Sequence, residues 1–379
     1  MTAVVHLTSS HRAQDTRVFR KECVALASAG YEVSLVVPTS HARTLNGVNI
    51  VPVPESRTRL RRLTVTCRDV YRVARKLKAD IYHIHDPEMV LWALLLKKTA
   101  QATVIYDVHE YYAEVIPSRE WFPVLLRKPA AVLIRWLESL AAARFDGIIV
   151  VNDDMAERFR GINGKVVTVR NFPRLENFDY SPALDRAAPR NGVVFVGAVS
   201  DDRGLNIMLE AVQLLGDQGL RTGCTIIGPI TAGRFKDIPL ADLNRRWSSF
   251  GVEFTGPLSY EHAMDRVYRS QVAWWPVQDT TINHSRALPN KLFEYMAAGK
   301  PVVASNYGYV AEILRNASAG LLVAPADAAA HAAAVAYLLR NPAEAAAMGA
   351  RGRQAVVEHY NWAKEEAKLL QFYAGLNRG

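Results

Sequence analysis

The chain has 379 residues, of which 50% are hydrophobic and 22% are charged, and its formal net charge is +9. This is the composition of a globular protein, and its length suggests two domains. No run of 18 apolar residues occurs and the N-terminus does not have the pattern of a signal peptide, so we expect no spanning helix and no export. The three scattered cysteines argue against disulfides or a zinc site and favour a cytoplasmic location.

The positive net charge implies an anionic partner. Cations are concentrated between Arg57 and Lys78, where Asp69 is the only acid. An anionic membrane surface or a phosphorylated substrate would suit this stretch, and a solvated helix face would explain it equally well. No aromatic-studded sheet motif or recognition helix accompanies the cations, so nucleic acid is not an expected partner.

In the first half, short apolar runs alternate with longer helical patterns. A helix is expected over residues 18–29, with Gly30 just past its end. Runs that are rich in Val and Ile throughout are typical of strands in a parallel sheet buried on both faces, and their alternation with helices indicates βαβ units. The predicted strands are residues 3–8, 31–38, 48–54, 81–85, 102–110, 147–153 and 166–172.

Residues 173–191, which are rich in Pro, Asp, Asn and Arg, predict a linker. Strands are then expected at residues 193–199, 224–229, 252–257, 272–277, 301–305 and 320–325, followed by an Ala-rich helical region from Ala326. We therefore predict the α/β class, with two Rossmann-like doubly wound parallel-sheet domains, residues 1–172 and 192–360, that face a ligand-binding cleft. An amphipathic helix within residues 361–379 is expected to pack back on the first domain.

The segment 288–305 is the most informative. A helix is expected to begin at Asn290, and the free N–H groups of a helix that follows a strand favour a phosphate. Glu294 lies one turn further along, on the same face as Asn290 and Lys291. A carboxylate at this place could accept the two hydroxyls of a ribose. Alternatively, Glu294 is only a favourable acid near the positive end of the helix.

Two more residues follow apolar strands directly. Arg203 precedes a helix, where its guanidinium could bind diphosphate oxygens, although a solvated loop residue is the alternative. His109 follows a strand of the first domain, with Asp107 and Glu110 beside it. A lone histidine is more often structural, but this position favours a role at a ligand site.

The remaining site candidates also lie at strand ends. The first strand-to-helix loop lacks a Gly-x-Gly-x-x-Gly pattern, so the first domain is not expected to bind a dinucleotide. Candidates for the acceptor in this domain are Asp15, Arg17, His85 and Asp86. In the second domain, the backbone of Gly228 and Pro229, and of residues 255–257, could contact a base. Such contacts leave little trace in a sequence, so the base is left open.

Several motifs, in order along nearly the whole chain, resemble family 4 of the retaining glycosyltransferases with the GT-B fold. They are HRAQDTRVFRKEC, IYHIHDPE, VIYDVHEYY, VGAVSDDRGLNIMLEA, IIGP, LPNKLFEYMAAGKPVVAS and HYNW. The resemblance implies a nucleoside-diphosphate sugar donor, such as a UDP- or GDP-sugar, and transfer with retention. It also implies that Glu294 binds the ribose and that His109 touches the transferred sugar.

The sequence departs from the family pattern at the donor site. Arg286 stands where the family usually has a glutamate that contacts the donor sugar. The family usually has two cations after the first strand of the second domain. Here Ala198 replaces one of them and Arg203 replaces the other, so Lys291 and Arg286 are candidate substitutes. These departures leave the sugar open and keep a degenerate nucleotide-sugar-binding protein as an alternative.

We expect a metal-independent transferase without a cofactor, because the sequence shows neither a protein nucleophile nor a metal cluster. The expected catalytic residues are His109, Arg203 and Lys291, and the expected donor-binding residues are Glu294, Asn290, Leu288, Gly228, Pro229 and Arg286. An epimerase or phosphorylase of similar fold is less consistent with the SDDRG and PNKLFEYMAAG segments. No pair of acids indicates a glycosidase, and a two-lobed sugar-binding protein would normally be exported.

The acceptor is expected to be a hydroxyl group. The basic stretch, together with Trp121-Phe122-Pro123 ahead of Arg127 and Lys128, suits a peripheral enzyme on the inner face of the cell membrane. Its acceptor would then be a lipid-linked intermediate of surface polysaccharide or glycolipid biosynthesis. The alternative is a soluble small molecule, as in natural-product glycosylation.

Overall fold

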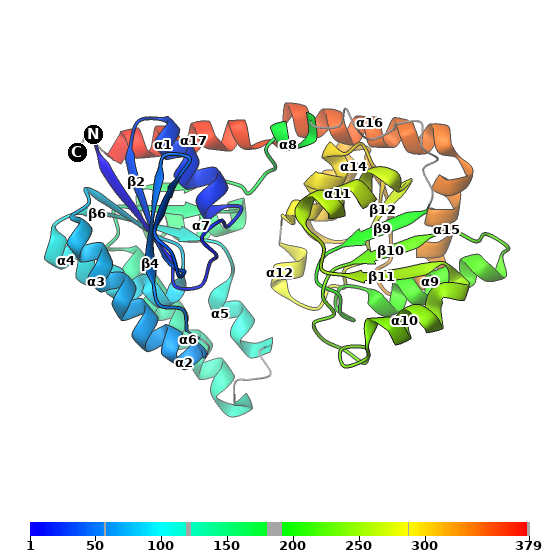
Figure 1. The fold of residues 1–379 in the computed structure, drawn as a ribbon, viewed down its shortest axis with the longest axis horizontal. Helices are drawn as coiled ribbons and strands as arrows, with labels where there is room; N and C mark the ends of the chain where they lie inside the picture. Colours follow the sequence, from blue (N-terminus) through cyan, green and yellow to red (C-terminus); the bar gives the residue numbers. More distant parts are fainter. Residues whose placement is uncertain (57, 119–122, 180–191, 287, 377–379) are drawn as a thin grey trace. The chain divides into compact units, whose positions relative to one another are not determined.

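The computed structural model describes residues 1–379 except 57, 119–122, 180–191, 287 and 377–379. The chain forms two compact units, Met1–Asn171 with Trp362–Gly379 and Phe172–Asn361 (Figure 1). The linker predicted for residues 173–191 lies outside the described residues from residue 180 onward. Its first part belongs to the second unit and includes the short helix α8 (Glu176–Asp179).

The first unit is built on an eight-stranded sheet in the order β3-β4-β2-β1-β5-β6-β7-β8. The strands are β1 (Ala3–Leu7), β2 (Glu32–Pro38), β3 (Arg43–Leu45), β4 (Val48–Val53), β5 (Ile81–Ile84), β6 (Thr103–Val108), β7 (Gly147–Val150) and β8 (Val166–Thr168). Neighbouring strands are parallel except β3, which pairs antiparallel with β4 at the edge. This hairpin was not predicted, although its turn residues Asn46 and Gly47, with φ of 50° and 77°, are those that a tight hairpin turn requires.

The helices of the first unit cover this sheet and follow the predicted alternation. They are η1 (Val18–Cys23), α1 (Val24–Ser28), α2 (Arg59–Arg61), η2 (Arg62–Thr66), α3 (Cys67–Leu77), η3 (Pro87–Met89), α4 (Val90–Ala100), α5 (Tyr112–Val115), η4 (Ile116–Ser118), α6 (Val124–Ala142), α7 (Asp153–Arg160) and α17 (Trp362–Leu376). The first of them begins as a π-helical turn and ends before Gly30, whose φ is 89°. Helix α17 lies in this unit, where Leu369 and Tyr373 are fully buried.

The second unit has an all-parallel, six-stranded sheet in the order β11-β10-β9-β12-β13-β14. Its strands are β9 (Val193–Val196), β10 (Cys224–Ile227), β11 (Val252–Gly256), β12 (Val272–Trp275), β13 (Val302–Ser305) and β14 (Gly320–Val323). Its other helices are α9 (Leu205–Asp217), α10 (Leu240–Trp247), η5 (Ser248–Phe250), α11 (Tyr260–Arg269), α12 (Ile282–Ser285), α13 (Asn290–Ala297), α14 (Gly308–Ala317), α15 (Ala328–Arg340) and α16 (Pro342–Glu358).

Both sheets reverse their winding beside their first strand. In the first unit the reversal lies between β1 and β5, and in the second it lies between β9 and β12. This doubly wound arrangement confirms the predicted fold class. Ligands of such sheets bind outside the carboxyl ends of the strands at this switch point, so ligand sites are expected beside the residues that follow β1, β5, β9 and β12.

A close backbone approach shapes the switch point of the second unit. Gly204 ends the turn after β9 with φ of 83°, and a Cβ atom there would lie 2.1 Å from the carbonyl oxygen of Pro276, just after β12. The backbone N–H of Gln278 also donates to the carbonyl of Asp202 at 2.8 Å. The turn after β9 is therefore fixed against the chain that leaves β12.

Replacing Gly204 by Ala should test this approach. Gly219→Ala is the matched control, because Gly219 also has positive φ (73°) but has no atom within 4 Å of its added Cβ. Both variants carry backbone strain, whereas only Gly204→Ala must displace Pro276. We expect Gly204→Ala to lower the free energy of unfolding of the second unit by about 1–3 kcal/mol more than the control does. Equal losses in denaturant titrations would contradict this packing.

Candidate active site

Helix α13 is firmly anchored beside the switch point of the second unit. It begins at Asn290 after an extended Pro289, and no side chain caps its first turn. The buried Tyr295 accepts a hydrogen bond from the backbone N–H of Val196, at the end of β9, with a distance of 2.7 Å. Phe293 is also fully buried. These contacts fix which face of the helix carries the polar residues of the predicted site.

The polar face of α13 carries Lys291 and Glu294. Lys291 Nζ lies 2.6 Å from Glu294 Oε2, which confirms the expected same-face arrangement. Glu294 is only 8% exposed, and Lys291 lies over the ring of Tyr260, 5.6 Å from its centroid. Leu288 and Asn290 are half-buried at the start of the helix. The carboxylate of Glu294 is therefore a held and mostly desolvated group rather than a freely mobile surface acid.

Arg203 lies on the β12 side of the same switch point. It is half-buried in the turn before α9, and its backbone N–H donates to the carbonyl of Ser200 at 3.0 Å. Burial and then the charge of Arg203 lower the pKa of His284, which lies in α12. Arg286 is exposed at the end of α12, and Ala198 is exposed after β9. The structure thus brings Arg203 close to the chain that follows β12.

Backbone rather than side chains forms the ends of β10 and β11. A Cβ atom on Gly228 would lie 1.8 Å from the carbonyl oxygen of Gly197, and the Gly228 N–H donates to the Gly256 carbonyl at 3.0 Å. Pro229 is exposed, and the Thr255 hydroxyl donates to the same Gly256 carbonyl. This edge presents few side-chain groups for reading a base, which is why the sequence could not identify one.

In the first unit, Asp107 on β6 is the centre of a buried polar network. Arg17 forms two hydrogen bonds with its carboxylate, Nε to Oδ2 at 3.1 Å and Nη2 to Oδ1 at 2.9 Å. His109 Nε2 lies 2.7 Å from Oδ2, and His85 Nδ1 lies 3.3 Å from it. Burial would raise the pKa of Asp107, but Arg17 and His109 hold it well below its ordinary value. The carboxylate is therefore an anion.

This anion fixes the state of His109. Because His109 Nε2 faces the Asp107 carboxylate, this nitrogen carries the proton and donates it in the hydrogen bond. The other ring nitrogen, Nδ1, then has the lone pair that can accept a hydrogen bond. The His109 side chain is 12% exposed, whereas those of Arg17 and His85 are 5% and 0% exposed. Burial also lowers the pKa of His85 to about 4. Within this network, His109 is the histidine that solvent reaches.

The four residues predicted to bind the acceptor mostly have interior roles. Arg17, His85 and Asp86 are buried, and Asp15 is half-buried. Asp15 accepts hydrogen bonds from the N–H groups of Arg17 and Val18 and so holds the start of η1. In this structure these side chains position the strand ends and the start of η1, and their contact with an acceptor stays a prediction.

Asp86 forms hydrogen bonds that join the two strand ends at the switch point of the first unit. Its Oδ2 accepts from the Thr8 hydroxyl at 2.8 Å and the Ser9 N–H at 2.6 Å, and its Oδ1 accepts from the Ser10 hydroxyl at 2.5 Å. Asp86 follows β5, and residues 8–10 follow β1, so these bonds join the two strand ends. Sequence reasoning did not identify the serine and threonine partners.

Sequence reasoning also missed the role of Asp107 and a group of buried histidines. Asp107 on β6 and His109 just past its end are two residues apart, as are His83 on β5 and His85 just past its end, and this spacing is the signal that could have revealed them. The structure brings together two sets of side chains in this unit that could hold a metal ion, His6 with Glu22, His83 and His85, and His85 with Asp107 and His109. Because the members of each set come from separate elements, the two-residue spacing identifies only part of each set.

Two family models match the chain. Residues 16–173 match the model described as "Glycosyl transferase 4-like domain", and residues 190–341 match the model described as "Glycosyl transferases group 1". Together they cover most of both units. The first match lies almost entirely in the first unit, and the second match lies in the second unit.

Individual relatives agree with these models. The chain is 25% identical to a phosphatidyl-myo-inositol mannosyltransferase of Mycolicibacterium smegmatis, over 92% of this chain and 86% of that one. It is 23% identical to a glycogen synthase of Mycobacterium tuberculosis, over 80% and 71%. Similar solved structures are sucrose-phosphate synthase of Thermosynechococcus elongatus (TM-score 0.74, 17% identity, 100% of both chains) and Anabaena HepE with UDP-glucose (TM-score 0.70, 14%, 99% and 100%).

Asp107→Asn should test the network in the first unit. The change keeps the shape but removes the charge that neutralises the buried Arg17, so we expect a loss of about 3–5 kcal/mol in the free energy of unfolding. Asp153→Asn is the control, because Asp153 pairs with Arg170 while 67% exposed, and exposed pairs contribute about 0–1 kcal/mol. Denaturant unfolding curves that give the two variants equal stability would contradict the central place of Asp107.

Proposed function

We propose a reaction for this chain from the premise that it belongs to the family 4-like glycosyltransferases with the GT-B fold. As a member it transfers a glycosyl group from a nucleotide sugar to an acceptor. We propose further that the donor is a nucleoside-diphosphate sugar, that the acceptor is a hydroxyl group, and that transfer proceeds with retention and without a metal ion at the reacting atoms. The observation that carries the donor assignment is the buried, anchored Glu294 of α13.

The donor would lie at the switch point of the second unit. The diphosphate would accept hydrogen bonds from the free N–H groups at the start of α13, where the helix dipole favours an anion. Glu294 would accept the ribose hydroxyls, and Lys291, now paired with Glu294 at 2.6 Å, would contribute a cation to the phosphates. The similar HepE structure is a complex with UDP-glucose, which supports a donor of this class.

Catalysis on this proposal is positioning and electrostatic stabilisation. Arg203 and Lys291 would offset the charge that develops on the leaving diphosphate, and the diphosphate would take the proton of the acceptor hydroxyl. His109, with its proton held on Nε2 by Asp107, would meet the transferred sugar through Nδ1. Arg286, exposed at the end of α12, stands where family members usually have a glutamate, so the sugar is best identified by testing several donors.

Glu294→Ala should weaken nucleotide binding. The variant removes the proposed ribose acceptor, and one hydrogen bond to a charged group contributes about 1.5–3 kcal/mol, so we expect Kd for the preferred nucleoside diphosphate to rise at least about tenfold. Glu312→Ala on the exposed face of α14 is the control and should leave Kd unchanged. Titration calorimetry that returns the wild-type Kd for Glu294→Ala would refute the site.

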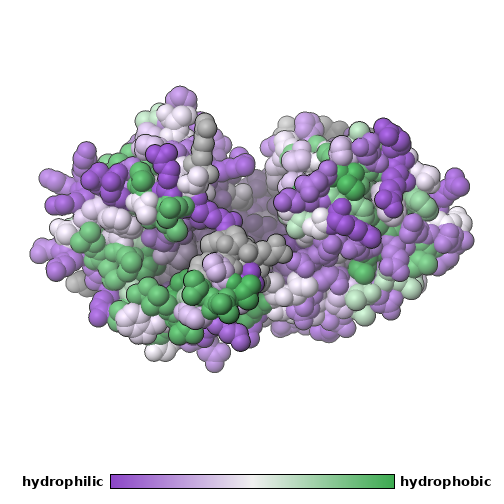
Figure 2. Space-filling model, turned by 90° about the horizontal axis from the view of Figure 1, so that it is seen from below, coloured by the Kyte–Doolittle hydropathy of each residue, from purple (hydrophilic) through white to green (hydrophobic). Residues whose placement is uncertain are grey.

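The acceptor proposal rests on a surface of the first unit. Helix α6 packs on α4, and α4 packs on α3. Apolar side chains of α4 and α6 point outward, among them Leu91, Val124, Leu125, Leu126, Val132, Leu133 and Trp136, each at least 55% exposed. We call these seven residues the α4–α6 apolar face. Figure 2 shows apolar side chains gathered on the lower surface of this unit. Such a patch on a folded protein marks an interaction site.

Cations stand close to this face. Exposed basic residues on and beside α3 are Arg68, Arg72, Arg75, Lys76 and Lys78, and Lys128 and Arg135 lie on α6 itself. Within the described residues, no helix is long and apolar enough to span a bilayer. We therefore propose a peripheral contact with an anionic membrane and a lipid-linked acceptor, in polysaccharide or glycolipid synthesis. The predicted contribution of Trp121 and Phe122 lies outside the described residues.

The membrane proposal predicts salt-sensitive binding to anionic vesicles. Wild-type protein should sediment with phosphatidylglycerol vesicles at low salt, and part of it should be released as salt rises, because screening weakens the electrostatic attraction. Leu125→Glu with Leu133→Glu should abolish the binding. Val357→Glu, at an exposed apolar residue of the second unit, is the control. Equal binding to neutral and anionic vesicles, or no loss in the double variant, would count against a membrane contact of this kind.

A further inference from the structure

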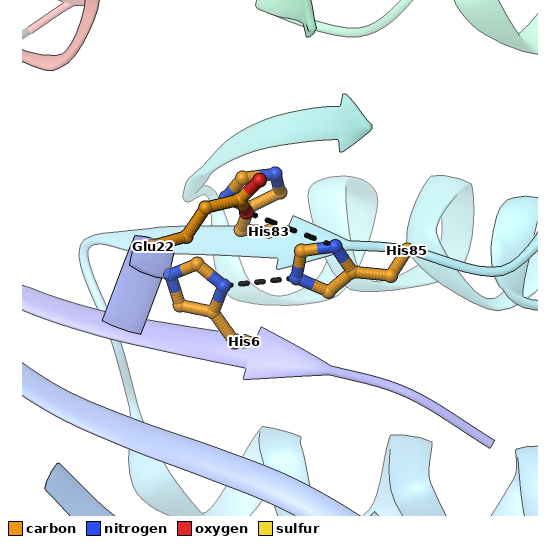
Figure 3. Close-up of side chains that lie close together, drawn as sticks. All are labelled: His6, Glu22, His83 and His85. Atoms are coloured by element: carbon orange, nitrogen blue, oxygen red, sulfur yellow. Dashed lines mark hydrogen bonds and ion pairs between the residues drawn. The ribbon is translucent and has the colours of Figure 1, made fainter. Parts of the chain in front are cut away.

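Four side chains from three elements meet in the interior of the first unit (Figure 3). His6 lies on β1 directly opposite His83 of the neighbouring parallel strand β5, His85 follows β5, and Glu22 lies in η1. All four residues are 0% exposed. Each offers one possible ligand atom, and these four atoms lie within 4.8 Å of one another.

Several polar atoms of this cluster lack hydrogen-bond partners. They are Nε2 of His6, Nε2 of His83 and both carboxylate oxygens of Glu22. The carboxylate of Glu22 does form an ion pair with Arg17, with 2.9 Å between Nε and Oε1. Buried polar atoms are almost always paired, and an unpaired one costs stability. Apart from Oε1, three such atoms lie at one place, which indicates that a further species belongs there.

The other nitrogens of the two imidazole rings are already held. His6 Nδ1 lies 2.9 Å from His85 Nε2, and His83 Nδ1 lies 2.7 Å from the hydroxyl of Tyr373 on α17. A histidine that binds a metal typically donates its second N–H to such a partner, and this fixes the tautomer and aims the remaining lone pair. With Nδ1 donating in both rings, each Nε2 becomes an acceptor atom inside the cluster.

We propose that this cluster is a structural site for a divalent transition-metal ion, with Zn²⁺ as the best fit, bound by Nε2 of His6, Nε2 of His83 and an oxygen of Glu22. Two imidazoles and one carboxylate form a ligand set that zinc accepts, and its tetrahedral geometry leaves one position for a water molecule. The side-chain mixture does not suit Mg²⁺ or Ca²⁺, which prefer ligand shells of oxygen alone.

The charge balance supports an ion at this place. Glu22 and Asp107 are two buried carboxylates beside one buried cation, Arg17. Arg17 alone would leave these two carboxylates with one uncompensated negative charge in the interior. A bound metal ion would compensate that charge.

The site would join the parts of the first unit. It would link η1 to β1 and β5 directly, and through the Tyr373 hydroxyl it would hold α17, which comes from the far end of the sequence. Since the ligands are fully buried, the ion would stabilise the fold and would not contact a donor or an acceptor. The inference therefore stands independently of the proposed reaction and of its metal independence.

The test begins with metal content. Protein purified without chelators and without a metal-affinity column should contain about one zinc ion per chain by plasma mass spectrometry, as a structural site requires. Glu22→Gln and His83→Gln should lose the metal. His331→Gln, at a buried histidine of the second unit, is the control and should keep it. Protein prepared with Co²⁺ should show the intense visible absorption of a tetrahedral site, and Glu22→Gln should not.

A second measurement covers the case in which these variants fail to fold. Prolonged treatment of the wild-type protein with a strong chelator should lower its Tm, and added Zn²⁺ should restore it, whereas added Mg²⁺ should not. Wild-type protein that contains no metal, and whose Tm responds neither to the chelator nor to Zn²⁺ or Co²⁺ added during refolding, would overturn the proposal. Water molecules would then satisfy the unpaired atoms.

Discussion

The ion pair between Arg17 and Asp107 is the constraint on which the first unit depends. Both side chains are buried, so neither charge has solvent to compensate it, and each stabilises the other only while their geometry is kept. Arg17 comes from the start of η1 and Asp107 from β6, so the pair fixes a helix against the sheet. The same carboxylate orients His109, and the same guanidinium faces Glu22 in the histidine cluster. The orientation of His109, which we propose to contact the sugar, and the order of the interior thus depend on one pair of charges.

In the second unit, close backbone contacts rather than a buried ion pair shape the candidate donor site. Short parallel strands end in glycines whose backbones touch, as with Gly228 against Gly197, and a short helix begins close to these ends. The resulting surface offers N–H groups, the Arg203 guanidinium and one held carboxylate, Glu294. On the proposed function, such a surface would bind the parts common to all nucleotide sugars, the diphosphate and the ribose. The shape of this surface depends on the topology of the strands more than on any single side chain.

The fold class and part of the candidate donor site could be predicted from the sequence, because both depend on local patterns. Apolar runs alternating with helices predicted both doubly wound sheets, and the i, i+3 spacing of Lys291 and Glu294 predicted that they share a helix face. Long-range packing was not predictable in this way. Arg17 and His85 lie at strand ends, which suggested ligand contact, but both are buried beside Asp107, which is far away in the chain. The histidine cluster escaped notice for the same reason, since β1 and β5 become neighbours only in the folded sheet.

The most direct test of the central claim is turnover of a nucleotide sugar. The wild-type protein would be incubated with UDP- and GDP-linked hexoses, with a membrane extract as the source of acceptor, while release of the nucleoside diphosphate is followed. We expect that one donor class is consumed, that consumption depends on Glu294, and that the sugar in the product keeps the anomeric configuration of the donor. Absence of binding and of turnover with every donor would contradict this claim.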